Sequence, residues 1–411
     1  MNPQIFREYD IRGIADTDLT DETVRAVGRA FADRMSDRGK SRIAVGRDVR
    51  LSSPRIATAL ISGLVERGMH VIDVGQVPTP ALYFAILQQK ADGGVMVTGS
   101  HNPIEYNGLK LSEGLASLHG PDIQALWRAA ATPGLPVQRG SVEQVSVDKP
   151  YLEDLVARIQ LKRKLKVVVD PGNGAASILG PELIRRLGCD VDAIFAEPDG
   201  RFPNHLPDPT VPELMRSLQE RVRAVGADLG IGFDGDADRV GAVDEKGRLL
   251  FGDQLLGLYA QDVLATHPGA PIVFEVKCSQ GLVELIRDKG GKPIMWKAGH
   301  SLIKAKMRET KAPLGGEVWG TCSSRTNFPV TMTPCTEPDA CSGCWPPRTS
   351  RSRRWSTRCR SRSTYRPRKS GSIARTTGSL LSWTRCASTS ARRTRSSTST
   401  ARGCSSGTDG V

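Results

Sequence analysis

Residues 94–103 read GVMVTGSHNP, and this stretch indicates how the chain folds. The apolar run at 94–98 is typical of a short buried strand, and Gly99 permits a tight turn directly after it. Asn102 and Pro103 then prevent the chain from continuing as a helix. Ser100 is therefore predicted to lie at the carboxyl end of a strand, which is the edge where open α/β sheets bind ligands.

The same order of strand and helix recurs through the first 317 residues. Strands are predicted at 42–46, 70–75, 94–98, 166–170, 228–234, 272–276 and 293–296. Ser53-Pro54, as N-cap and first helical residue, and Thr79-Pro80 are predicted to open two of the helices, and Gly68 to end the first of them. A hairpin is expected at 239–250, with Lys246-Gly247 at its turn. Strands alternating with helices favour largely parallel sheets flanked by helices.

We therefore predict three successive α/β domains with mixed or parallel sheets around a central cleft. The chain is too long for one hydrophobic core, and the pattern restarts twice, which gives predicted domains at 1–146, 147–248 and 249–317. No uncharged apolar run reaches membrane-spanning length, and the N-terminal segment lacks the apolar core of a secretory signal. We expect a cytoplasmic protein with small-molecule partners and without membrane or nucleic-acid partners.

Residues 318–411 differ sharply in composition from the rest. They carry 17 Lys and Arg but only three Asp and Glu, whereas residues 1–317 hold 40 basic and 41 acidic side chains. Seven of the nine cysteines lie there, and about two-thirds of the segment is Ser, Thr, Arg, Cys or Pro. Such a composition predicts a disordered, low-complexity tail in place of a fourth domain. Two hypotheses explain it: a basic nucleic-acid-binding tail, or translation in a shifted reading frame, which the abrupt change favours.

The loop after the strand at 94–98 suits phosphate chemistry. Ser100 is a nucleophile candidate, and His101 and Lys110 are cations close to it in sequence. These neighbours favour a serine that carries or receives a dianionic phosphate. An ordinary polar loop is the alternative for this hexapeptide taken alone.

A second loop, DGDADR at 234–239, also follows a predicted strand directly. Asp234, Asp236 and Asp238 place three hard oxygen ligands at alternate positions, which suits one divalent cation such as Mg²⁺. The spacing does not fit an EF-hand. A solvated acidic loop is the weaker alternative, because three closely spaced carboxylates repel one another unless a cation neutralises them.

Together the two loops resemble the α-D-phosphohexomutase family, closest to its bacterial phosphomannomutase/phosphoglucomutase branch. Further segments carry the resemblance in the same order: FREYDIRG (6–13), VGRD (45–48), DPGNGAA (170–176), VKCS (276–279), KAGHSLIK (297–304) and GGE (315–317). The resemblance implies interconversion of hexose 1-phosphate and hexose 6-phosphate, of mannose or glucose, through a phosphoserine and a hexose 1,6-bisphosphate.

The resemblance also implies a role for each matching residue. Ser100 would be the phosphoserine, and its phosphate with Asp234, Asp236 and Asp238 would hold Mg²⁺. His101 and Lys110 would act as general acid and base beside the transferred group, and Arg239 would line the site with them. Substrate-binding positions would be Tyr9, Arg12, Lys277, His300 and Glu317. The two loops must then meet in space.

The sequence leaves other functions open. A phosphoglucosamine mutase shares both loops, and a phosphatase with an aspartate nucleophile would leave the serine loop without a role. The family loop GEMSGH reads Gly316-Glu317-Val318-Trp319-Gly320-Thr321 here. An indole in place of a hydroxyl predicts weaker sugar binding, so a catalytically impaired relative with a basic tail is the third alternative.

Overall fold

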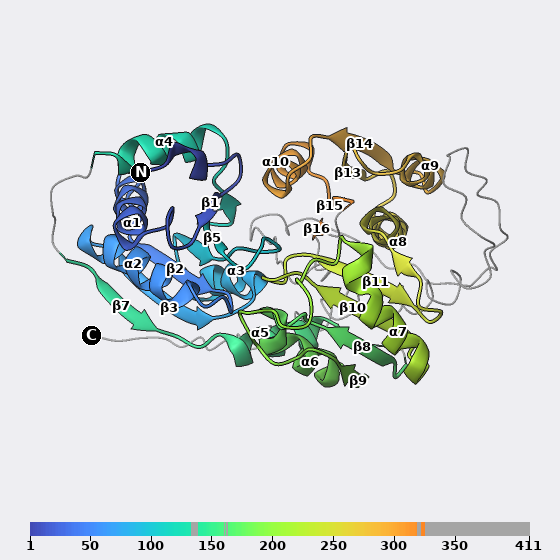
Figure 1. Ribbon diagram of the computed structural model, residues 1–411. Coiled ribbons are helices and arrows are strands. Elements are labelled where there is room, and N and C mark those ends of the chain that lie inside the picture. Colours follow the sequence, from blue (N-terminus) through green and yellow to red (C-terminus); the bar gives the residue numbers. More distant parts are fainter. Residues whose placement is uncertain (133–138, 160, 162, 319–321, 325–411) are drawn as a thin grey trace, which may run out of the picture.

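The computed structural model describes residues 1–132, 139–159, 161, 163–318 and 322–324, without the side chains of His300 and 322–324. The described residues form three α/β units, which Figure 1 shows in blue and teal, in green and yellow, and in orange. The predicted fold class of three α/β domains with mixed or parallel sheets is confirmed. Apart from Val318 and 322–324, the tail and both hypotheses about it lie outside the described residues.

The first unit is built on a seven-stranded sheet. Its order is β1 (Ile11–Ile14), β5 (Tyr106–Glu113), β4 (Gly93–Val97), β2 (Arg42–Arg47), β3 (His70–Gln76) and β7 (Ser141–Gln144), with β6 (Ala116–Ser117) beside β5. Its helices are η1 (Pro3–Ile5), α1 (Asp21–Ser36), α2 (Ser53–Glu66), α3 (Thr79–Gln88) and α4 (Pro121–Ala130). β2, β3, β4 and β7 are parallel, whereas β5 runs antiparallel to β4 and β1. The short serine loop joins β4 to β5, and a connection this short permits only antiparallel pairing.

One predicted cap in this unit is wrong. Helix α2 begins at Ser53 with Ser52 as its N-cap, and no side chain caps it. The Ser53 hydroxyl instead donates a hydrogen bond to the buried Asp48 carboxylate. Gly68 follows the helix with φ of 82°, a left-handed conformation that ends it as predicted.

The second unit holds a five-stranded sheet. Its order is β12 (Leu249–Leu250), β11 (Val240–Asp244), β10 (Leu229–Phe233), β8 (Lys166–Asp170) and β9 (Asp190–Ala193). Its helices are α5 (Asp148–Arg158), α6 (Ala176–Arg186), η2 (Pro212–Met215) and α7 (Arg216–Val225). β10 and β11 form an antiparallel pair, and the aspartate loop is their connection. The predicted turn between β11 and β12 is confirmed, because Gly247 there has φ of 73°.

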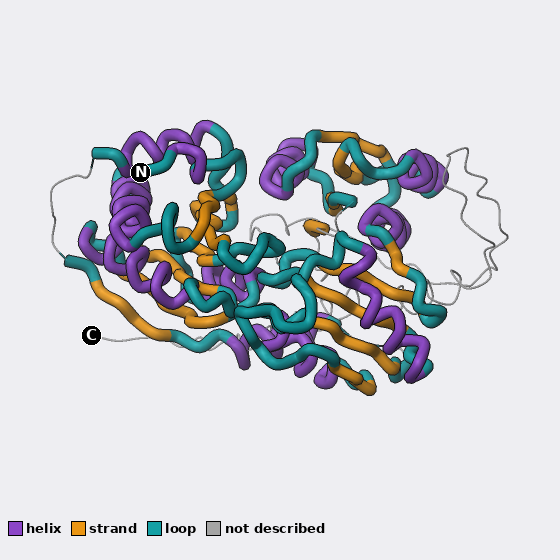
Figure 2. Tube along the Cα trace, in the orientation of Figure 1, coloured by secondary structure: helices purple, strands orange, loops and turns teal. Residues whose placement is uncertain are grey.

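The third unit holds a four-stranded sheet. Its order is β14 (Lys292–Trp296), β13 (Pro271–Glu275), β15 (Leu314–Gly316) and β16 (Cys322–Ser324). The helices are α8 (Gly252–Thr266), α9 (Gln280–Asp288) and α10 (His300–Thr310). Figure 2 shows the same strands and helices by class, with this unit standing above the second one.

The first two units share one hydrophobic core. Tyr151 and Leu155 of α5 are buried between apolar side chains of α3 and β3 on one side and Leu179 and Leu183 of α6 on the other. Tyr151 is fully buried, and its ring meets that of Phe84 edge-on at 5.4 Å between centroids. A close-packed interior transmits position rigidly. The carboxyl ends of β4 and β10 are therefore held in a fixed relation by apolar packing.

Within the described ranges, no helix has both the length and the apolar character required to cross a bilayer.

Candidate active site

The serine loop and the aspartate loop meet at the junction of the first two units. The Ser100 hydroxyl donates a hydrogen bond to Asp234 Oδ2 at 2.8 Å, although the residues are 134 positions apart. Both side chains are buried. A Cβ atom on Gly235 would lie 2.3 Å from the Ser100 carbonyl oxygen, so only glycine permits this approach. The predicted meeting of the two loops is confirmed.

The serine itself has an unusual backbone conformation. Ser100 has φ of +50°, in the left-handed region that non-glycine residues seldom occupy. Asp48 holds this turn in place, because its Oδ2 accepts hydrogen bonds from the Thr98 hydroxyl (2.7 Å) and the Gly99 N–H (3.2 Å). Thr98 Oγ1 in turn accepts the Ser100 N–H at 2.8 Å. Strain of this kind persists only where surrounding contacts over-determine the conformation.

Arg50 provides most of those contacts. Its guanidinium is fully buried, and Nη2 donates to the carbonyl oxygens of Ser100 (2.8 Å) and Asn102 (2.6 Å). Nη1 donates to those of Pro103 (2.7 Å) and Tyr106 (3.0 Å). Three carbonyl groups of the serine loop and that of Tyr106, at the start of β5, thus converge on a single cation. Arg50 and Asp48 were not predicted as site residues; the signal in the sequence was a charged pair closely following a buried strand.

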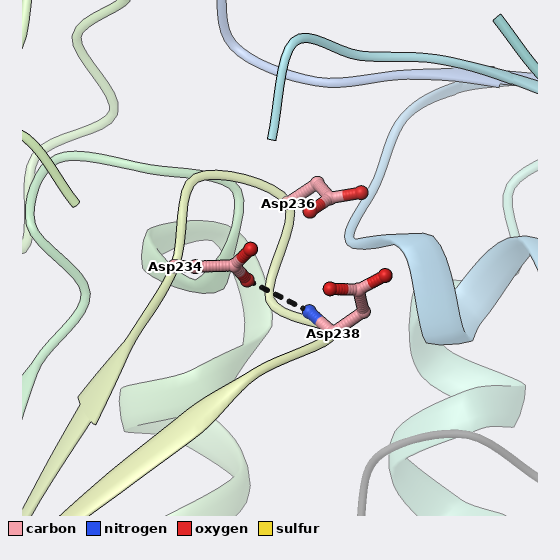
Figure 3. A group of neighbouring side chains, drawn as sticks. All are labelled: Asp234, Asp236 and Asp238. Atoms are coloured by element: carbon pink, nitrogen blue, oxygen red, sulfur yellow. Dashed lines mark hydrogen bonds between the residues drawn. The ribbon is translucent and has the colours of Figure 1, made fainter. Parts of the chain in front are cut away.

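The three aspartates occupy one tight turn, and in Figure 3 the Asp234 carboxylate points across this turn toward the Asp238 backbone nitrogen. One ligand oxygen from each lies within 4.8 Å of the other two, with Asp234 and Asp236 buried and Asp238 half-buried. Asp234 Oδ1 accepts the backbone N–H groups of Asp238 (3.0 Å) and Arg239 (3.1 Å), which closes the turn. Ala237 completes it with φ of 62°.

Negative charge is concentrated here. Burial and the neighbouring carboxylates Asp236 and Asp238 raise the pKa of Asp234. Lys110 from β5 offsets part of the charge, with Nζ 2.5 Å from Asp236 Oδ2 and 2.6 Å from Asp238 Oδ2. Burial alone would lower the pKa of Lys110, but the three carboxylates outweigh it and raise that pKa, so Lys110 is an ammonium ion.

The aspartate loop fits a divalent metal ion. Asp236 Oδ1 is buried and has no hydrogen-bond partner among the described residues. Together with Asp234 and Asp238 it offers carboxylate oxygens, which are the ligands hard cations prefer. The Ser100 hydroxyl at Asp234 places a fourth oxygen beside them.

His101 adjoins the reactive hydroxyl. Its Nδ1 lies 3.2 Å from Ser100 Oγ. Burial first, then the positive charges of Arg239, Arg12 and Lys110, lower the pKa of His101 to about 4. The imidazole is therefore neutral near pH 7, and a neutral imidazole can accept a proton.

Two predicted arginines also belong to this region. Arg12 Nη1 donates to Asn102 Oδ1 at 2.9 Å, and its Nε is buried without a hydrogen-bond partner among the described residues. Nη2 of Arg12 pairs with Asp10 at 2.5 Å. The Nε atom of Arg239 lies 4.0 Å from Asp234 Oδ2. The structure thus brings Ser100 and its loop, both arginines and the aspartates together.

The remaining predicted residues belong to the third unit or touch it. The Tyr9 hydroxyl donates to the Ala298 carbonyl at 2.9 Å, and the Gly299 N–H donates to Glu317 Oε1 at 2.6 Å. Burial, followed by the charge of Glu275, raises the pKa of Glu317 to about 7. Lys277 is exposed just after β13, and the side chain of His300 lies outside the described residues.

Comparison with known proteins follows the three units. Models described as phosphoglucomutase/phosphomannomutase alpha/beta/alpha domains I, II and III match residues 3–131, 149–247 and 251–340. A phosphomannomutase/phosphoglucomutase of Pseudomonas putida is 49% identical over 316 residues, covering 77% of this chain and 68% of that protein. A phosphoglucomutase of Neisseria gonorrhoeae is 42% identical over 318 residues, covering 77% and 69%.

Solved structures agree. A phosphoglucomutase/phosphomannomutase family protein from Burkholderia thailandensis superposes with a TM-score of 0.77 at 43% identity, over 79% of this chain and 73% of that one. A structure titled a phosphomannomutase from Thermus thermophilus gives a TM-score of 0.69 at 25% identity, over 78% and 75%.

Proposed function

The chain belongs to the phosphoglucomutase/phosphomannomutase family, and from this membership we propose that it interconverts hexose 1-phosphate and hexose 6-phosphate, of mannose or glucose or both. The names of the relatives support this isomerase activity. The observation that carries the site assignment is the 2.8 Å hydrogen bond between Ser100 and the buried aspartate loop.

Ser100 would carry the transferable group. Its phosphoserine form gives the phosphoryl group to the free hydroxyl of a hexose monophosphate, which leaves free serine and a hexose 1,6-bisphosphate. The other phosphate of that intermediate then returns to Ser100, and the isomeric monophosphate leaves. Each of the two transfers breaks one P–O bond and forms another, so atoms and electrons balance over the cycle.

The neighbouring side chains would handle protons and charge. Neutral His101, 3.2 Å from Ser100 Oγ, is placed to accept a proton from that oxygen. Lys110 is the second acid-base candidate, and as an ammonium ion it also balances negative charge, as do Arg12 and Arg239. Positioning and electrostatics supply most of the catalysis in phosphoryl transfer.

The aspartate loop would hold the metal ion. Asp234, Asp236 and Asp238, with an oxygen on Ser100, would hold Mg²⁺, because the donor set is entirely hard oxygen. When bound, the ion neutralises phosphate charge and polarises a phosphoryl oxygen.

Tyr9, Arg12, Lys277, His300 and Glu317 would bind the sugar phosphate. Glu317 supports this role, since it is buried, accepts the Gly299 N–H, and is close enough to Arg239 and Asp238 for their charges to act on its pKa. A phosphoglucosamine mutase is the second candidate, and the relatives' names give it no added support. Relative rates on the 6-phosphates of mannose, glucose and glucosamine separate the two. We also propose a cytoplasmic location, since the buried Cys189 is a free thiol and reduced thiols are typical of that compartment.

The test is Ser100→Ala, measured by turnover and by intact mass. We expect no turnover, loss of the phosphate adduct and an unchanged circular dichroism spectrum. Ser177→Ala is the matched control, because that hydroxyl is buried without a hydrogen-bond partner among the described residues. Full activity in Ser100→Ala would refute the assignment.

A further inference from the structure

Thr79 makes a contact that its place in the helix does not require. It is the first residue of α3, and the N-cap position belongs to Pro78. The Thr79 hydroxyl does not cap the helix but donates to Asp236 Oδ2 at 2.6 Å. Its backbone N–H donates to the Asp236 carbonyl oxygen at 2.9 Å. Thr79 is only 1% exposed, and both bonds cross from the first unit to the second.

These bonds determine which oxygen of Asp236 remains available. Oδ2 accepts from Thr79 and from Lys110, whereas Oδ1 is buried without a partner in the part of the chain that the structure describes. Lys110 divides its contact between Asp236 and Asp238, but the Thr79 hydroxyl bonds Asp236. The carboxylate is thereby fixed in rotation with Oδ1 free.

The backbone hydrogen bond between Thr79 and Asp236 also helps to fix the aspartate loop. The first N–H groups of a helix have no partner within the helix and carry partial positive charge. Here one of them donates to the Asp236 carbonyl oxygen, so the amino end of α3 lies against the aspartate loop. The Asp236 carbonyl oxygen thus gives the first N–H of α3 a hydrogen-bond partner, and the same bond fixes the position of the aspartate loop.

We propose that Thr79 is a positioning residue that orients Asp236 toward the divalent cation and links metal binding to the contact between the first two units. This inference rests on the proposed metal role of the aspartate loop. Hydrogen-bonded partners of metal ligands typically change metal affinity by about 10- to 100-fold when removed. Thr79 is therefore expected to act on affinity, without touching the reacting groups.

The experiment measures Mn²⁺ binding to the full chain by electron paramagnetic resonance, with turnover measured alongside. Thr79→Val removes the hydroxyl at constant shape and is expected to weaken Mn²⁺ binding at least tenfold. Thr79→Ser keeps the donor and should bind within about twofold of the unchanged chain, by the same reasoning. Thr58→Val is the control, because the Thr58 hydroxyl donates to the Pro54 carbonyl oxygen within α2, with no further partner among the described residues. Turnover of Thr79→Val should recover at high metal concentration.

The outcomes are distinct. Weaker binding in Thr79→Val and retained binding in Thr79→Ser support the inference. Unchanged affinity in Thr79→Val, where the unchanged chain binds Mn²⁺, overturns the inference alone. An unchanged chain that binds no Mn²⁺ overturns the proposed metal role and the inference with it. If valine prevents folding, Thr79→Ala provides the same readout.

Discussion

Replacing Glu317 with glutamine isolates one buried charge in the third unit. Glu317 is only 7% exposed, and burial, with Glu275 close by, raises its pKa from 4.5 to about 7. Glutamine keeps the oxygen that accepts the Gly299 N–H. The substitution therefore removes the titration and preserves the shape and the recorded hydrogen bond.

The sign and size of the effect follow from these two pKa values. A carboxyl group whose pKa is higher in the folded state binds its proton more tightly there. Its contribution to stability is complete below about pH 4.5 and is lost as the pH rises through about 7. The difference corresponds to about 3 kcal/mol in total, of which about 2 kcal/mol falls between about pH 5.5 and 8.5.

Hydrogen exchange measures this loss within the third unit. Amide protection in β13 and β15 gives the free energy of opening of that unit, without assuming that the whole chain unfolds in one step. From pH 5.5 to 8.5 we expect Glu317→Gln to lose about 2 kcal/mol less than the unchanged chain. The exposed Glu284 on α9 supplies the control, Glu284→Gln. Equal pH dependence in the unchanged chain and in Glu317→Gln would refute the reasoning.

Two further predictions concern the junction of the first two units. Gly235→Ala places a methyl group 2.3 Å from the Ser100 carbonyl oxygen, so turnover should fall at least about 100-fold, since small misplacements cost this much. Gly281→Ala, whose new Cβ would have no neighbour nearer than 3.7 Å, should keep full turnover and gain up to about 1 kcal/mol of unfolding free energy. Arg50→Met leaves Asp48 buried without its cation, and the free energy of opening of the first unit, measured by amide protection in β2 and β4, should fall by about 3–5 kcal/mol. A loss below about 1 kcal/mol would contradict the role given to Arg50.

The sequence predicted those parts of the fold that are marked by continuous apolar segments. Strands β4 and β10 are continuous apolar segments that end at polar loops, so both their existence and the position of Ser100 and Asp234 could be inferred. Strand β5 reads YNGLKLSE, which mixes polar and apolar residues without a strong period. Its pairing is set by the short serine loop and by its neighbours β1 and β4, and no local pattern records these.

The contacts that hold the site in place could not be predicted from the sequence, for a different reason. Arg50 binds main-chain oxygens of the serine loop, and every residue has such an oxygen, so no side-chain pattern marks the partner. Thr79 precedes Pro80, as is typical of a helix start, so nothing in the sequence indicated a further role for its hydroxyl. The hydroxyl donates instead to Asp236, and this contact depends on how the first two units pack against each other, which no local pattern records.

The three units are joined by two different kinds of contact, and this difference matters for the proposed reaction. The first and second units share a hydrophobic core, which fixes Ser100 against Asp234. The second and third units also share apolar packing, because Leu255 of α8 belongs to the core of the second unit. Among the described residues, no apolar cluster spans the first and third units; contacts between those two include the Tyr9 hydrogen bond to Ala298 and the Lys304 ammonium 4.7 Å from the Tyr83 ring centroid. Polar contacts of this kind cost little to exchange with water. A bisphosphate that must present each of its two phosphates to one serine needs a rigid transfer site, and the core that fixes Ser100 against Asp234 provides it.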